Sequence, residues 1–254
     1  MSIGLDEAVE LTRTGDVWVF RGRSVPDRAI QLTTNSPVNH VGMAVVLDDL
    51  PPLMWHAELG RSLPDMWTGT HHRGVQLHDL RDAVCVWANR YGQRAWLRQL
   101  EPPADVTMEQ AVLRTVARLD GTPFPSTAQL AWRWARGRVP QVRLPVPLPL
   151  RRDRAAGPGD RGAAHEEQAE QGATQAERGS GAADRPGGVA VRDRALETAY
   201  CAEVVAVTYE AMGLLPAGRR PNWYDPGRFW SGDDLGLTGG AQLGAEIEVR
   251  IPPR

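Results

Sequence analysis

Lysine is absent from this chain of 254 residues, and all 29 of its basic residues are arginines. Without lysine, the protein cannot form a Schiff base with a carbonyl substrate, and it has no lysine to bind a nucleotide phosphate. Neither common type of glycine-rich phosphate-binding loop occurs in the sequence. These absences exclude kinases, P-loop nucleotidases and pyridoxal enzymes.

Cysteine is scarce, since only Cys85 and Cys201 occur, and no Cys-x-x-Cys pair suggests a zinc or redox site. No apolar run reaches the roughly 18 residues of a membrane-spanning helix. The first residues have neither the basic region nor the apolar core of a signal peptide. A net charge of -2 argues against a nucleic-acid binder. We therefore expect a cytoplasmic globular protein with no transmembrane segment and no nucleic-acid partner.

Short apolar runs separated by turn residues are typical of a mainly antiparallel sheet or a small barrel. Asp16 comes after Gly15 and just before the apolar residues 17–20, and it is expected to cap or position a neighbouring turn. We expect strands at residues 15–20, 40–47, 53–58, 74–80 and 84–88.

Helical spacing begins after residue 103. Val112, Val116 and Leu119 recur at the helical period, which predicts a helix that ends at Gly121. A second helix is expected at residues 126–136.

The composition divides the chain into three parts. Residues 1–150 are expected to form the N-terminal part of a single domain. Residues 151–195 contain no Leu, Ile, Phe, Tyr or Trp, so we predict a disordered insert that is available to a protein partner. Residues 196–254 are expected to complete the same domain with a cysteine-bearing helix and a loop-rich tail packed by aromatic residues.

Cys201 lies in the first turn of the helix that is predicted in this last part. Unpaired N–H groups and the positive end of the helix dipole favour a thiolate there, and they can also stabilise an oxyanion. A cysteine hydrolase needs this arrangement. The competing interpretation is a small buried hydrophobic residue at a helix start. Cys85 alternates with valines and a tryptophan and is expected to lie in the core.

A thiol nucleophile needs a base, and the base needs an orienting group. His40 begins an apolar strand directly after a polar loop, which places its ring at the edge of the sheet. His56 and Glu58 are two residues apart on one strand, so both side chains point to the same face. The competing interpretation is that this face is simply the solvent side.

The other histidines give no metal motif. His71 and His72 adjoin polar residues and are expected to lie in a solvated loop. The spacing of His56, His71, His72 and His78 does not match a known ligand pattern, so no metal site is predicted.

Five segments of the sequence occur together in the order found in a known family. They resemble the circularly permuted papain-like enzymes of the NlpC/P60 superfamily, in the branch that includes the YiiX-like proteins and lecithin:retinol acyltransferase. The resemblance covers residues 12–136 and 196–213. It implies an α+β, permuted papain-like fold in which the sheet or barrel packs against the cysteine-bearing helix. The segments are residues 15–20 (Gly-Asp-Val-Trp-Val-Phe), 39–46 (Asn-His-Val-Gly-Met-Ala-Val-Val), 55–58 (Trp-His-Ala-Glu), 121–124 (Gly-Thr-Pro-Phe) and 200–205 (Tyr-Cys-Ala-Glu-Val-Val).

The resemblance also implies roles for individual residues. Cys201 is the expected nucleophile and His40 the general base. His56 is the expected orienting residue, with Glu58 as its rival. Tyr200 and the backbone N–H of Cys201 are expected to line the oxyanion site.

These roles predict a cysteine-dependent hydrolase or acyl-transfer enzyme that needs no cofactor. Its substrate is a peptide, isopeptide or lipid with an amide or ester bond, which is cleaved through a thioester. Ala202 stands where the family has a serine, and the insert is unusually long, so the substrate stays unassigned. The alternative is a catalytically silent binding or scaffold protein of the same fold whose insert recruits a partner.

Overall fold

The computed structural model describes five stretches of the chain. The predicted helix at residues 126–136, the predicted insert at residues 151–195 and Tyr200 lie outside the described residues. The described residues all belong to one compact unit, which is formed by residues 1–139 and 188–254. The described stretches are residues 1–23, 36–58, 60–123, 201–231 and 235–253.

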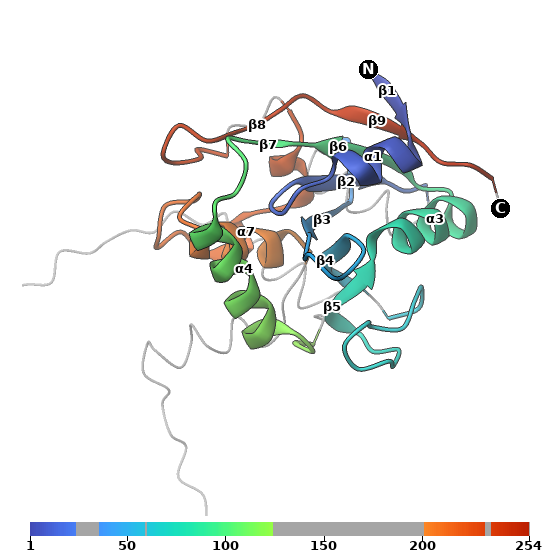
Figure 1. Cartoon of the computed structure of the whole chain (residues 1–254), viewed down its shortest axis with the longest axis horizontal. Coiled ribbons are helices and arrows are strands. Elements are labelled where there is room, and N and C mark those ends of the chain that lie inside the picture. Colours follow the sequence, from blue (N-terminus) through green and yellow to red (C-terminus); the bar gives the residue numbers. More distant parts are fainter. Residues whose placement is uncertain (24–35, 59, 124–200, 232–234, 254) are drawn as a thin grey trace, which may run out of the picture. The chain divides into compact units, whose positions relative to one another are not determined.

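A seven-stranded sheet with the order β1-β9-β6-β2-β3-β4-β5 organises this unit (Figure 1). Adjacent strands are antiparallel except for β1 and β9, which are parallel. Among the described residues, β1 and β5 are the two ends of the order, so the element is a sheet and not a barrel. Its strands are β1 (Ser2–Gly4), β2 (Val17–Arg21), β3 (His40–Val45), β4 (Leu53–Glu58), β5 (Gly74–Asp79), β6 (Arg94–Arg98) and β9 (Ile247–Arg250).

The strands predicted at residues 15–20, 40–47, 53–58 and 74–80 are confirmed as β2 to β5. The C-terminal tail is more ordered than we expected. It carries two short 3₁₀ helices, η1 (Pro221–Trp223) and η2 (Pro226–Phe229). Its last strand, β9, lies between β1 and β6 in the large sheet. A second, two-stranded sheet pairs β7 (Leu100–Glu101) with β8 (Gln242–Leu243).

The four described α-helices fall into two groups, and each group packs with its own set of apolar residues. Helix α7 contacts β3, β4 and α4, whereas α3 contacts β4, β5 and α1. Figure 1 shows the same grouping. Two separate buried clusters result, one containing the α7 residues and the other containing the α3 residues. The helices are α1 (Leu5–Leu11), α3 (Leu80–Tyr91), α4 (Val106–Leu119) and α7 (Cys201–Ala211).

Alternation along β3 assigns its side chains to these two clusters. Val41 and Met43 belong to the α7 cluster, and Ala44 belongs to the α3 cluster. Gly42 faces the α3 side as well, because a Cβ atom there would lie 2.4 Å from the sulfur of Met54, a member of the α3 cluster. Residues of β3 with even numbers, including His40, therefore leave the strand on the α3 side.

Helix α3 corrects one prediction, because residues 84–88 are helical and do not form a strand. The Asp79 carboxylate accepts the N–H of Asp82 and begins the helix. Gly92, with a φ of 64°, ends it in the left-handed conformation. These two caps, together with the helical spacing of its buried side chains, outweigh the β-propensity of the Val-Cys-Val-Trp segment. Cys85 is buried as expected, but on a helix.

Candidate functional site

Helix α7 is held against the sheet by two buried hydrogen bonds. The indole N–H of Trp55 on β4 donates to the Thr208 hydroxyl at 3.1 Å. The Tyr209 hydroxyl donates to the carbonyl oxygen of Gly15 at 2.6 Å. Both bonds are satisfied inside the apolar α7 cluster, so they fix how the helix sits on the strands.

Cys201 is the first described residue of α7, and its side chain is only 2% exposed. Burial raises the pKa of the Cys201 thiol to about 12. The backbone N–H groups of Val41 and Ala202 interact with the sulfur and act in the opposite direction. The sulfur therefore lies beside the peptide that joins His40 to Val41.

His40 begins β3, and its ring packs between aromatic residues of the α3 side. Its ring centroid lies 5.8 Å from that of Phe20 and 5.1 Å from that of Trp87. Burial lowers the pKa of His40 to about 4, so the ring is neutral near pH 7. Cys201 reaches the same strand from the α7 side. Among the described residues, no hydrogen bond joins the His40 ring to the Cys201 thiol.

His56 occupies the position expected of an orienting residue. Its Nδ1 atom lies 3.3 Å from Nε2 of His40, and the two rings meet edge to face. His56 is fully buried on β4, and burial holds its pKa well below the usual range. The sequence-derived pair of His40 and His56 is therefore brought together.

Two further residues extend this contact, and sequence reasoning gave neither of them a role in it. Nδ1 of His78 on β5 lies 3.1 Å from Nε2 of His56. Nε2 of His78 in turn lies 3.2 Å from Oε1 of Gln76. Both residues are fully buried. The sequence does carry a signal, because two polar residues alternate with Val75 and Leu77 on a strand that is buried on both faces.

Gln76 determines which nitrogen donates and which accepts in each hydrogen bond along this chain of imidazoles. Its amide nitrogen donates to the carbonyl oxygens of His72 and Gly74, at 3.3 Å and 3.4 Å. Its Oε1 atom must therefore accept a proton from Nε2 of His78. His78 then accepts from Nε2 of His56, and His56 accepts from Nε2 of His40.

The outcome is a defined tautomer for each ring. With the Gln76 amide oriented in this way, each imidazole carries its proton on Nε2, and burial lowers the pKa of all three rings so that they are neutral near pH 7. Nδ1 of His40 is consequently an unprotonated nitrogen with a free lone pair, which is the form that a general base requires.

Glu58 is tied to a neighbouring loop and has no hydrogen bond to His40. Its carboxylate accepts the Ser62 hydroxyl at 2.7 Å and 2.6 Å and the Ser62 N–H at 3.3 Å. Burial raises the pKa of Glu58, and the hydrogen bonds from Ser62, Trp87 and Arg61 act against that increase. Of the two rivals for orienting His40, only His56 contacts its ring.

The remaining sequence-derived candidates lie elsewhere. His71 is exposed, and His72 is half-buried with Nε2 3.2 Å from the carbonyl oxygen of Val75. Asp16 accepts the backbone N–H groups of Arg13 and Leu100, in agreement with a positioning role. Across the described ranges, every helix is too short or too polar to cross a bilayer.

The arrangement of the described elements defines a mixed α+β protein with one large sheet and four helices. No family model matches the chain, and no curated protein matches it. Among solved structures, it is similar to YiiX from Escherichia coli O157:H7, which is described as a metalloprotein of DUF1105. The two are 23% identical over 48% of this chain and 56% of that chain, with a TM-score of 0.36. The permuted papain-like arrangement stays a prediction.

Proposed function

We propose that this protein is a cysteine-dependent hydrolase or acyl-transfer enzyme, with Cys201 as nucleophile, His40 as general base and His56 as the residue that orients it. One observation carries this proposal. The imidazole chain leaves a free lone pair on Nδ1 of His40, and the next peptide N–H, that of Val41, interacts with the Cys201 sulfur.

The chemistry follows from these groups. Nδ1 of His40 takes the thiol proton, and the resulting thiolate attacks the carbonyl carbon of an amide or ester. The backbone N–H of Cys201 contributes to stabilising the oxyanion that forms. The imidazolium returns its proton to the leaving amine or alcohol as the carbon–heteroatom bond breaks. A thioester remains on Cys201, and water or another acceptor resolves it. Peptide, isopeptide and lipid substrates all meet these requirements.

The resting geometry sets one condition for this reaction. The His40 ring leaves β3 on the α3 side, whereas the buried thiol reaches the strand from the α7 side. Catalysis therefore requires a change of side-chain conformation that brings Nδ1 of His40 into hydrogen-bond contact with the thiol. A thiolate formed beside the Val41 and Ala202 N–H groups would be stabilised by both.

The test is the pH dependence of Cys201 alkylation by iodoacetamide, in protein carrying Cys85→Ala. We expect Cys201 of the native protein to be alkylated with an apparent thiol pKa well below the value of about 12 that burial alone gives it, and we expect at least a roughly tenfold slower reaction at pH 7 after His40→Ala. The matched control is His71→Ala, which removes an exposed histidine. A thiol that reacts equally in the His40→Ala and His71→Ala proteins would exclude the Cys–His pair.

A second candidate function is a catalytically silent binding or scaffold protein. The observation that favours it is the depth of Cys201, since burial alone raises the pKa of the thiol far above neutral pH. In this case Cys201 stays unreactive in native protein and is alkylated only after unfolding. The same alkylation experiment therefore decides between the two functions.

A further inference from the structure

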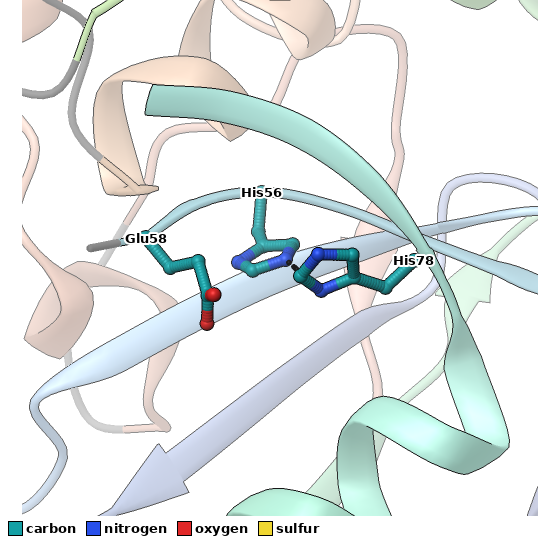
Figure 2. Close-up of side chains that lie close together, drawn as sticks. All are labelled: His56, Glu58 and His78. Carbon is teal, nitrogen blue, oxygen red and sulfur yellow. Dashed lines mark hydrogen bonds between the residues drawn. The ribbon is translucent and has the colours of Figure 1, made fainter. Parts of the chain in front are cut away.

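We propose that His56, Glu58 and His78 form a binding site for one divalent metal ion of the zinc class. Their potential ligand atoms all lie within 4.8 Å of one another. Figure 2 shows the two imidazole rings next to each other, with the Glu58 carboxylate on the same side of β4. Two nitrogens and a carboxylate oxygen are a ligand set that zinc prefers, and three protein ligands leave a fourth position open.

The sheet holds these three side chains in place. His56 and Glu58 are alternate residues of β4, so they project from the same face. The neighbouring strand β5 is paired with β4 along its whole length, and its His78 is opposite Met54 in this register. This pairing brings His78 beside His56. Ligands on paired strands need little rearrangement to bind an ion.

The separation of the two histidines fits a shared ion. Nε2 of His56 and Nδ1 of His78 are 3.1 Å apart. Two nitrogens that each lie about 2.0–2.1 Å from a tetrahedral zinc ion are separated by roughly 3.3 Å. An ion could therefore replace the proton that Nε2 of His56 donates to Nδ1 of His78, with only a small movement of the rings.

The surrounding contacts suit such a site. Metal-binding histidines usually donate their other N–H group to a fixed acceptor, which sets the orientation of the ring. Gln76 already provides that acceptor for His78, at 3.2 Å, and Nε2 of His40 faces the other nitrogen of His56. The hydroxyl of Ser62 fixes the Glu58 carboxylate. The two histidines are fully buried and Glu58 is half-buried, so the glutamate is the most accessible of the three ligands.

A bound metal ion is expected to change the protonation of His40, and the effect of this change on Cys201 rests on the proposed function. An ion on Nε2 of His56 leaves the proton of that ring on Nδ1, which must then donate to Nε2 of His40. His40 then carries its own proton on Nδ1 and can no longer accept one from Cys201. Bound metal is thus expected to inhibit alkylation of Cys201, so the ion acts as a regulator.

Direct binding tests the site without any reference to activity. The full-length, metal-free protein is titrated with Zn²⁺ in competition with a chromophoric chelator. We expect one equivalent to bind. His78→Ala should weaken the affinity by about 100-fold or more, and Glu58→Gln, which preserves the shape of the side chain, by at least about tenfold. His71→Ala is the matched control and should bind Zn²⁺ like the unmodified chain.

Two further results make the outcome decisive. Circular dichroism of each variant tests whether it is folded. If His78→Ala protein is unfolded, Glu58→Gln is the variant that tests the site. Zn²⁺ affinity that is unchanged in folded Glu58→Gln protein, or that is lost with His71→Ala, overturns the proposal. Cys201→Ala removes the nucleophile but should leave Zn²⁺ binding intact, so failure of the proposed function and failure of the metal site are distinguishable.

Discussion

Nε2 of His40 lies 3.3 Å from Nδ1 of His56, and this contact connects β3 to β4 beyond the point where their backbones pair. The backbone pairing covers only residues 43–45 and 53–55. Val41 lies outside the paired stretch, and its N–H interacts with the Cys201 sulfur. The peptide between His40 and Val41 therefore lies beyond the backbone pairing with β4, and the imidazole chain and the thiol both approach it there.

Gln76→Leu is expected to disrupt the tautomers of the imidazole chain. The substitution removes the acceptor that holds the proton on Nε2 of His78, and it leaves a buried N–H without a partner. We expect nitrogen NMR of the imidazoles to show protonated and unprotonated Nδ1 forms of His40 in mixture. Alkylation of Cys201 should slow by about tenfold. Gln99→Leu, which removes a hydrogen bond to Leu11 remote from the histidines, is the control. An unchanged His40 tautomer in Gln76→Leu protein contradicts the assignment.

Gly42→Ala should disturb the same chain through sterics. A Cβ atom at residue 42 would lie 2.4 Å from the sulfur of Met54 and 3.3 Å from Cβ of His56. The Met54 side chain can move, so we expect a moderate loss of stability of about 1–3 kcal/mol in urea denaturation. Adding Met54→Ala makes room for the methyl group, and the double variant should show a smaller loss than the sum of the single losses. Simple additivity would show that the two side chains do not compete for space.

Local sequence patterns predicted the elements whose period is clear. The apolar segments around Val41 and Trp55 were recognisable as strands, and the spacing of Val112 and Val116 predicted α4 correctly. Residues 84–88 were assigned wrongly because their β-propensity is local, whereas the two helix caps lie outside the segment, at Asp79 and Gly92. Strand β9 was missed because a four-residue strand gains its stability from its neighbours β1 and β6.

Sequence patterns predicted only part of the candidate site, because some of its contacts join distant parts of the chain. The resemblance indicated His40, His56 and Cys201, and the first two do meet. His78 was named only within a histidine set that had no motif spacing. Its contact with His56 depends on the register of β5 against β4, which pairs His56 with Gln76 and Met54 with His78 and so makes the two histidines, 22 positions apart in the chain, diagonal neighbours. A single sequence does not specify that register, so the role of Gln76 could not be predicted either.

Tyr209→Phe should test how α7 is docked. The Tyr209 hydroxyl donates to the carbonyl oxygen of Gly15 at 2.6 Å inside the core, and phenylalanine leaves that oxygen without this donor. We expect a loss of about 1–3 kcal/mol in the free energy of unfolding, measured with urea. Tyr91→Phe is the matched control, because the Tyr91 hydroxyl donates to Arg61 at the surface. Equal effects of the two substitutions would show that the buried bond contributes little to docking.

Asp16 makes the free energy of unfolding depend on pH. Burial raises the pKa of Asp16 to about 6, and the N–H groups of Leu100 and Arg13 only partly oppose this. A folded-state pKa above the unfolded value means that the native protein binds the proton more tightly. The stability contributed by Asp16 is therefore complete below about pH 4 and is lost as the pH rises through 6. The full difference between the two limits amounts to about 3 kcal/mol, of which about 2 kcal/mol falls between pH 4 and pH 7. Urea denaturation of Asp16→Asn protein at both pH values should show a destabilisation, relative to the unmodified chain, that is larger at pH 4.

The exposed Asp49→Asn serves as the control for general charge effects. If the destabilisation by Asp16→Asn is instead larger at pH 7, Asp16 is ionised in the folded protein, and its hydrogen bonds with Leu100 and Arg13 outweigh the cost of its burial.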